Sequence, residues 1–244
     1  MSTWVNVARY HLIQRFGYLV LPWAALAFGF IVSLISIAFT PAGHHAVLSS
    51  QGLVRVTNTG GRYSGSLAIM YVFFFVMGMV SIGRSLPFGL TLGVSRRSYY
   101  IGTALLAVAL AVANGLGLTI LQAIERATGG WGMDAYLFRV PYILNGPWYL
   151  TWLTSTVALA LLFGYGMWFG IVYRRWNLGG TTAFIGAQVA VLLAAALVIT
   201  WANAWVGTGR FFTALSAAGL TGLLAVATAA LLAGGYATIR RVTV

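Results

Sequence analysis

Long runs of apolar residues alternate with short polar segments along most of the chain, and this pattern predicts membrane-spanning helices. A helix needs about 20 consecutive apolar residues to cross a bilayer. The segments that meet this requirement are 17–39, 66–83, 99–124, 148–173, 181–201 and 214–239. The first run is too long and starts too late for a cleaved signal peptide. We therefore expect an all-α membrane protein with six transmembrane helices in a single domain, 1–244.

Composition supports this fold class. The sequence is 60% hydrophobic and only 7% charged, whereas soluble domains are about half apolar with about a quarter of their residues charged. There is no cysteine, which excludes disulfides and thiolate metal sites. We expect no metal or cofactor in this chain.

The distribution of charge predicts an orientation. All 14 basic residues are arginines, and the only acids are Glu125 and Asp134. Short cytoplasmic loops of membrane proteins collect positive charge. If both termini are cytoplasmic, nine arginines fall inside and five outside, together with both acids. We expect this N-in, C-in orientation in a bacterial plasma membrane, and the arginines to serve as flanks of membrane helices rather than as a nucleic-acid surface. The inner group is Arg9, Arg15, Arg84, Arg96, Arg97, Arg174, Arg175, Arg240 and Arg241, and the outer group is Arg55, Arg62, Arg126, Arg139 and Arg210.

Three segments outside the spans have patterns of their own. Residues 1–16 place apolar side chains at helical spacing with arginines mostly elsewhere, which predicts an interfacial helix. In the first outer loop, the alternating LVRVT at 53–57 precedes the turn-prone NTGG and indicates a hairpin. The aromatic, glycine-containing stretch 201–212 is expected to be interfacial or re-entrant.

The spans contain no ionisable residue that would drive transport, and this narrows the function classes. Proton- and sodium-coupled carriers commonly rely on a carboxylate or histidine at membrane depth. A P-loop needs a lysine, and the chain has none. We therefore expect no enzymatic activity of the chain itself, and any ATP hydrolysis to occur elsewhere.

The second span is unusually rich in aromatic and methionine residues, MYVFFFVMGM at 70–79. Such side chains adapt to irregular apolar ligands, so they either line a cavity for a hydrophobic or amphipathic substrate or simply pack in the membrane. Small residues at four-residue spacing, Gly166 and Gly170 among them, predict close helix packing or a subunit contact. The candidate substrate-path residues are Tyr71, Phe74, Phe75, Met77 and Gln188.

A short apolar island bracketed by arginines follows the second span, in SIGRSLPFGLTLGVSRRSYYIGT at 81–103. Ser85 and Pro87 suit a helix start and Gly93 suits its exit, while Ser95 suits the cap of the next helix. A helix of two turns is not stable alone in water, so its apolar side chains need a surface to pack on.

These features resemble the membrane subunits of ABC-2 type exporters, particularly short permeases of actinobacteria. The resemblance covers most of the chain, and the loop LPFGLTLGVSRRSYYIGT is its most specific part. It implies a permease that works as a homodimer with two copies of a separate cytosolic ATPase, which would carry ATP and Mg²⁺. The loop would be the coupling helix that docks on the ATPase. The implied docking residues are Leu86, Phe88, Leu90, Leu92, Arg96 and Arg97.

The resemblance further implies that the second and fifth spans line the substrate path and that 201–212 re-enters the outer leaflet. The second inner loop, RRWNLGG at 174–180, departs from the pattern in its brevity and leaves little room for a second docking element. The expected substrate is hydrophobic or amphipathic, such as a drug, peptide or lipid. The alternative is a membrane protein that binds a toxin for immunity or scaffolds a complex without transport.

Overall fold

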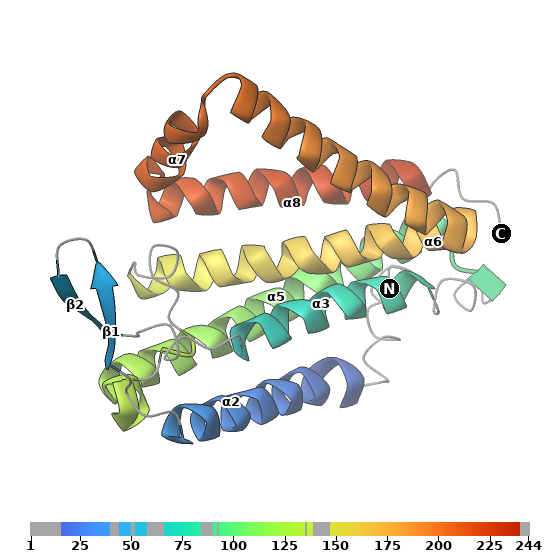
Figure 1. Cartoon of the computed structure of the whole chain (residues 1–244). Helices are drawn as coiled ribbons and strands as arrows, with labels where there is room; N and C mark the ends of the chain where they lie inside the picture. Colours follow the sequence, from blue (N-terminus) through green and yellow to red (C-terminus); the bar gives the residue numbers. More distant parts are fainter. Residues whose placement is uncertain are drawn as a thin grey trace.

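The structure is a computed structural model of the 244-residue chain, and it describes residues 16–39, 44–49, 52–57, 66–83, 90–91, 93–134, 136–138 and 147–239. Helices dominate the described residues (Figure 1). In chain order the elements are η2 (Phe16–Val20), α2 (Leu21–Phe39), β1 (His44–Ser49), β2 (Gly52–Thr57), α3 (Ser66–Gly83), α5 (Arg96–Ala127), η4 (Gly130–Asp134), α6 (Trp148–Trp201), α7 (Trp205–Ala214) and α8 (Ala217–Ile239).

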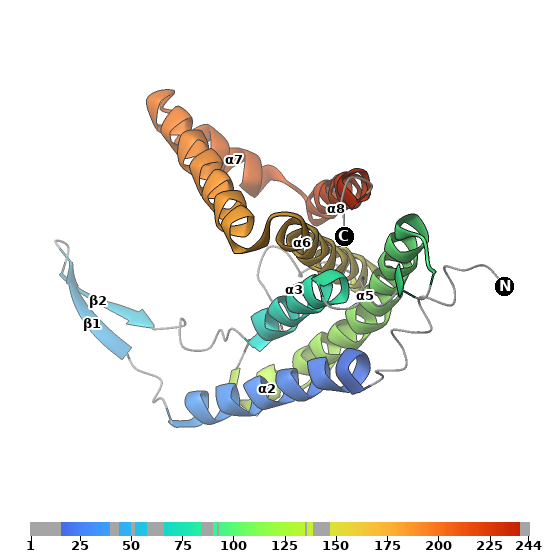
Figure 2. The ribbon, with the colours of Figure 1, turned by 90° about the vertical axis from the view of Figure 1, so that its right-hand side faces the viewer.

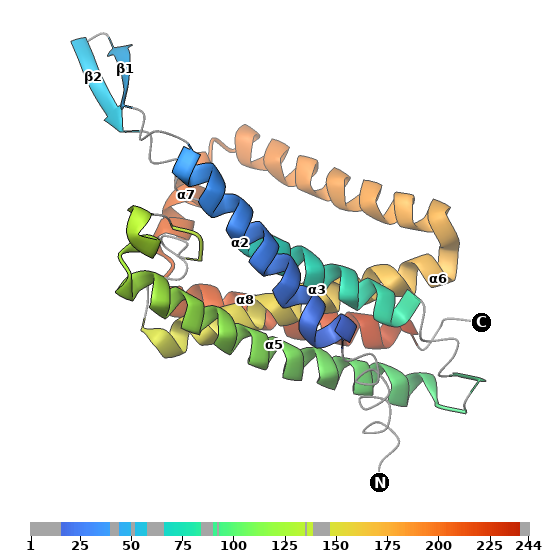
Figure 3. The same cartoon turned by 90° about the horizontal axis from the view of Figure 1, so that it is seen from below.

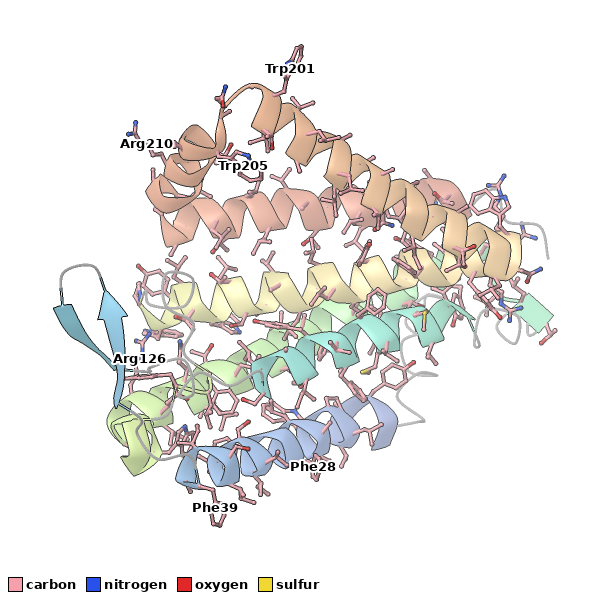
Figure 4. The ribbon with its side chains drawn as sticks, in the orientation of Figure 1. Phe28, Phe39, Arg126, Trp201, Trp205 and Arg210 are labelled. Atoms are coloured by element: carbon pink, nitrogen blue, oxygen red, sulfur yellow. The ribbon has the colours of Figure 1, made fainter. Side chains whose placement is uncertain are left out.

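The long helices run roughly alongside one another and alternate in direction, so the bundle has two distinct ends (Figures 1 and 3). At one end α5 begins, α6 reverses and α8 ends, and Arg96, Arg97, Arg174 and Arg175 lie there; we call it the arginine end. At the opposite end, the hairpin end, lie β1, β2, η4 and α7, with Arg126 and Arg210 (Figure 4). The two groups of arginines separated by the sequence pattern therefore lie at opposite ends, as far as the described residues include them.

Five helices of the described chain are long and apolar enough to cross a membrane: Gly17–Phe39, Ser66–Gly83, Arg96–Ala127, Trp148–Trp201 and Ala217–Ile239. They also expose much apolar surface away from the bundle, as Phe28 and Phe39 do on α2 (Figure 4). Large exposed apolar surfaces are untypical of soluble monomers and are expected of helices in lipid. The chain is a helical membrane protein.

The fourth of these helices, α6, is two segments joined at Asn177. Its 54 residues include one residue with non-helical backbone angles, Asn177, at φ 54° and ψ −153°. The segment before Asn177 and the segment after it run in nearly opposite directions (Figures 1 and 3). The short loop predicted at 174–180 is thus a reversal centred on one residue.

The core of the bundle is the contact between α3 and the first segment of α6, which is made close by glycine. A Cβ on Gly78 would meet the carbonyl of Phe163, one on Gly166 would meet the carbonyl of Phe75, and one on Gly170 would lie 2.7 Å from the Met79 carbonyl oxygen. Backbones can approach this closely only where no side chain stands between them. The close packing predicted for Gly166 and Gly170 is confirmed.

The second segment of α6 stands apart from this core. Figure 2 shows α2, α3, α5 and the first segment of α6 grouped together, while the second segment and α7 extend outward. Leu192, Leu193 and Leu197 of that segment are 60–70% exposed.

A two-stranded antiparallel hairpin interrupts the helical architecture, as the alternation at 53–57 predicted. β2 pairs with the segment before it, with His44 opposite Thr57 and Ser49 opposite Gly52. NTGG at 58–61 lies outside the described residues and is not the turn of this hairpin. The description all-α therefore omits one small sheet. The predicted interfacial helix at 1–16 also falls almost wholly outside the described residues.

Candidate functional site

The described part of the loop between α3 and α5 has the turn and cap that the sequence predicted. The N–H of Gly93 donates to the carbonyl of Leu90 over 3.0 Å, and Gly93 has φ 79°, a backbone conformation that glycine adopts without strain. Ser95 then caps α5, because its side-chain oxygen accepts from the backbone N–H of Ser98 at 3.2 Å. Capping of this kind fixes where the helix begins.

Hydrogen bonds to backbone carbonyls at the end of α3 join the helices on either side of this loop and α6. The hydroxyl of Tyr99, which is 1% exposed, donates to the carbonyl of Ser81 near the end of α3 over 2.7 Å. The guanidinium of Arg174, on α6, donates through Nε to the carbonyl of Gly83 over 2.7 Å. Leu90 is partly buried against the core of the bundle. The ends of α3 and α5 and the reversal of α6 are therefore linked around the loop.

Of the expected docking residues, Arg96 and Arg97 are the first two residues of α5 at the arginine end. Arg96 is half-buried and Arg97 is exposed, with its guanidinium carbon 5.8 Å from the centre of the Tyr236 ring on α8. Leu90 lies one turn before Gly93, against the core. Leu86, Phe88 and Leu92 lie outside the described residues.

The expected substrate-path residues divide between two environments. Phe74 and Met77 are 0% and 7% exposed, and the Phe74 ring meets Phe163 of α6 edge-on with 6.4 Å between centroids. These two side chains fill the α3–α6 contact. Tyr71 is partly buried against the same core, so packing accounts for this side of the aromatic run.

Phe75 and Gln188 belong instead to a group of aromatic residues where the second segment of α6 leaves the bundle. The Phe75 ring is 5.6 Å from Tyr165 and 5.3 Å from Phe169, and the hydroxyl of Tyr165 donates to the side-chain carbonyl of Gln188. We name the group the aromatic cluster: Phe75, Tyr165, Trp168, Phe169 and Phe184.

The amide of Gln188 has an unused donor at this place. Its nitrogen is buried and has no hydrogen-bond partner among the described residues. Leaving a buried amide N–H without an acceptor costs about 1–3 kcal/mol of folding free energy. A ligand atom that accepted a hydrogen bond from Gln188 would recover part of that cost. The aromatic cluster and the Gln188 amide together form an apolar group of side chains that contains one unused, buried hydrogen-bond donor.

The α6 members of the cluster were not predicted from the sequence. Tyr165 and Phe169 are four residues apart and therefore share one helix face. That spacing was the available signal, but it does not reveal that the helix reverses at Asn177 and brings Phe184 back to within 5.1 Å of Phe169.

A buried carboxylate lies in the described part of the hairpin end. Glu125 is 2% exposed, and its Oε2 accepts from the backbone N–H groups of Leu137 and Phe138, both at 2.9 Å, and from the indole of Trp131 at 3.2 Å. Phe30 of α2 packs on the Trp131 ring, with 4.7 Å between centroids. Glu125 thus fixes the segment after α5 against the bundle. It was expected at an outer helix end, but its burial was not predicted.

The predicted interfacial stretch 201–212 begins at the end of α6 and continues into α7. Trp201 and Trp205 are 89% and 54% exposed (Figure 4), and the Trp205 indole donates to the Thr200 hydroxyl at 3.0 Å. Within the described chain, no group of three or more histidine, aspartate or glutamate side chains is arranged to hold a metal ion.

Comparisons with models of protein families, with curated proteins and with solved structures find no match to this chain.

Proposed function

We propose that the chain is the permease subunit of an ATP-driven ABC exporter, with ATP and Mg²⁺ bound by two copies of a separate cytosolic ATPase. The observation that supports the proposal is that the helix ends around the 84–95 loop are tied together: Tyr99 of α5 bonds to Ser81 and Arg174 of α6 bonds to Gly83, while Leu90 packs on the core.

In this proposal the loop transmits movement of the ATPase to the membrane helices. A partner that displaces residues 86–93 would move the end of α3 and the start of α5 together, because Tyr99 ties them at Ser81. The glycine contacts would carry the first segment of α6 with α3, since their backbones touch. The exposed second segment would not follow as closely, so relative movement would concentrate at the aromatic cluster.

The substrate in this proposal is hydrophobic or amphipathic. The aromatic cluster supplies apolar, polarisable surface, and Gln188 supplies one neutral donor for a carbonyl or phosphoryl oxygen. An ion or a sugar would need more polar partners to replace its hydration.

The placement in the membrane follows the same proposal. The arginine end faces the cytoplasm of a bacterial cell, both segments of α6 cross the bilayer, and six spans result. The apolar face of the second α6 segment, which the bundle leaves exposed, would be covered by lipid and by the second permease of a homodimer.

The proposal is tested with Phe88→Asp, a change in the expected docking helix. Placing a charge on an apolar docking surface costs several kcal/mol of the contact, so this variant should insert normally but lose ATPase-driven transport. Phe211→Asp is the matched control, because Phe211 is an exposed phenylalanine that lies on α7, away from the loop.

The measurement is co-purification of a nucleotide-binding partner from native membranes, followed by ATPase and transport assays in proteoliposomes. Normal co-purification and transport by Phe88→Asp would show the docking assignment to be wrong. A wild-type chain that captures no nucleotide-binding partner would instead favour the immunity or scaffold alternative.

A further inference from the structure

A groove of about 440 Å³ opens between α5 and α8 at the arginine end, away from the aromatic cluster. This volume falls within the range of about 300–1,000 Å³ typical of small-molecule sites. Most of its lining comes from one face of α5, and two residues of α8 complete it. The lining residues are Arg97, Tyr100, Ile101, Ala104, Leu105, Val108, Leu232 and Tyr236.

The α5 residues form a single stripe whose chemistry changes along its length. From Arg97 to Val108 they recur at spacings of three and four, which places them on one helix face. At 1.5 Å per residue the stripe is about 16 Å long, close to half of the roughly 30 Å hydrocarbon thickness of a bilayer. The stripe therefore begins with a charged residue and continues as an apolar surface about as long as one leaflet is thick.

The polar end of the groove is formed by one arginine and two tyrosines. Arg97 lies over the ring of Tyr236 at 5.8 Å, and the rings of Tyr100 and Tyr236 are 6.0 Å apart. The Tyr100 hydroxyl donates to the carbonyl of Leu232 over 2.8 Å, which closes the groove between the two helices. Gly235 makes this contact possible, because a Cβ there would strike that hydroxyl.

Among the described side chains, no acid lies near Arg97. Glu125 is 28 residues further along α5, about 42 Å away, and is bound to the segment after that helix. Asp134 lies in η4, beyond the same end of α5. The net charge of +12 adds to the attraction of this surface for anions.

We propose that this groove is a binding site for an anionic phospholipid. The phosphate pairs with Arg97 beside the tyrosine rings, and an acyl chain lies along Ile101, Leu105 and Val108, which are 36–46% exposed. Basic pockets between transmembrane helices commonly hold anionic headgroups. A free phosphate would use only the head of the groove, and a zwitterionic lipid would bring a cationic group beside Arg97 together with its phosphate.

The test uses the purified full-length chain in detergent, without any ATPase, so its outcome is separate from that of the exporter proposal. Native mass spectrometry measures binding of phosphatidylglycerol and of phosphatidylcholine with identical acyl chains. The wild-type chain should favour phosphatidylglycerol by about fivefold, the contribution of one basic residue at an anionic surface. Inorganic phosphate at equal concentration should not displace the lipid.

Three variants locate the site. Arg97→Gln should abolish the preference, while Leu105→Trp should fill the apolar part of the groove and lower the binding of both lipids. Arg175→Gln should retain the preference, because Arg175 lies at the same end and over a ring, that of Trp176 at 4.6 Å, but does not line the groove.

Three results would overturn the proposal. One is an unchanged preference in Arg97→Gln, another is an equal loss in Arg175→Gln, and the third is displacement of the lipid by inorganic phosphate. If Arg97→Gln does not fold, Leu105→Trp decides alone, and normal lipid binding by that variant contradicts the site.

Discussion

Glu125 shows how much one side chain can organise at the end of a membrane bundle. Its Oε2 satisfies two backbone N–H groups and an indole N–H that the fold has removed from water. Charge-assisted hydrogen bonds are about twice as strong as neutral ones, so a carboxylate suits this place better than an amide. The residue acts by fixing the segment at 136–138 to the end of α5.

Replacing Glu125 should therefore loosen this segment in a graded way. Glu125→Ala leaves the N–H groups of Leu137 and Phe138 unsatisfied and should cost about 2–4 kcal/mol, whereas Glu125→Gln keeps an acceptor and should cost less. The measurement is thermal unfolding in detergent together with limited proteolysis after residue 128.

Ala127→Gln is the control for that experiment, since Ala127 is exposed at the end of the same helix and its change should leave both readouts unaltered. Identical unfolding temperatures and proteolytic patterns in Glu125→Ala and the wild-type chain would contradict the role given to the carboxylate.

Comparison of Ser95 with Glu125 shows which residue roles are readable from sequence. A helix cap depends on residues close together in the sequence. Ser95 was correctly predicted to cap the helix that begins at Arg96, because its hydrogen-bond partner is three residues away. The partners of Glu125 are 6 to 13 residues away, across a turn with positive φ at Trp131 and Gly132. No spacing rule connects them.

At the scale of elements, the glycine contact between α3 and α6 is the part of the fold most sensitive to added volume. Gly166→Ala should lower stability by about 1–3 kcal/mol, because its methyl group meets the backbone of Phe75 and forces the helices apart. Unfolding in mixed micelles measures this change.

Gly186→Ala is the matched control on the same helix. Gly186 lies in the second α6 segment, where an added methyl group would meet no neighbouring side chain or helix within 4 Å. Alanine there should be neutral or stabilise by up to about 1 kcal/mol through helix propensity. Equal losses in both variants would mean that Gly166 does not mark a close contact.

The reversal of α6 depends on the backbone conformation of a single residue, and substitutions at that residue test it. Asn177, at φ 54° and ψ −153°, has a backbone conformation that essentially only glycine adopts freely and that costs other residues about 1–3 kcal/mol. Asn177→Gly should therefore raise stability in detergent unfolding, and Asn177→Val should lower it. A valine variant as stable as the glycine variant would contradict this backbone geometry.

The positions of the long helices along the chain were largely predictable from the lengths of the apolar runs. The way these helices pack against one another was not. The apolar runs at 66–83 and 17–39 match α3 and η2 with α2 almost residue for residue. The separation of Phe74 from Phe75, one in the core and one in the aromatic cluster, depends on how the first segment of α6 packs on α3, since both rings meet that segment. That information is held in long-range contacts such as Gly78 against Phe163.

At the scale of the whole molecule, the central question is whether both segments of α6 cross the membrane. The segment after Asn177 runs back from the arginine end to the hairpin end (Figure 3). Its residues 178–202 extend about 36 Å, enough for the roughly 30 Å hydrocarbon core. If it crosses, Leu178 and Ala202 lie on opposite sides of the membrane.

The absence of cysteine from the sequence makes this measurable by single-cysteine labelling. Leu178→Cys and Ala202→Cys are suitable because both residues are exposed at the two ends of the segment. In intact cells a membrane-impermeant maleimide should label Ala202→Cys, and Leu178→Cys should react only after the membrane is opened. This result is expected from the proposed orientation, in which the bias of arginines puts the arginine end on the cytoplasmic side.

Two other labelling patterns would each correspond to a different arrangement of the chain in the membrane. Labelling of both cysteines from one side means that the segment lies along the membrane surface and that α6 contributes a single span. The reverse pattern keeps six spans but inverts the orientation, which places the 84–95 loop outside the cell, beyond reach of a cytosolic ATPase. Either pattern rejects the exporter proposal, whereas the lipid groove, which needs only Arg97 near a headgroup, is compatible with both.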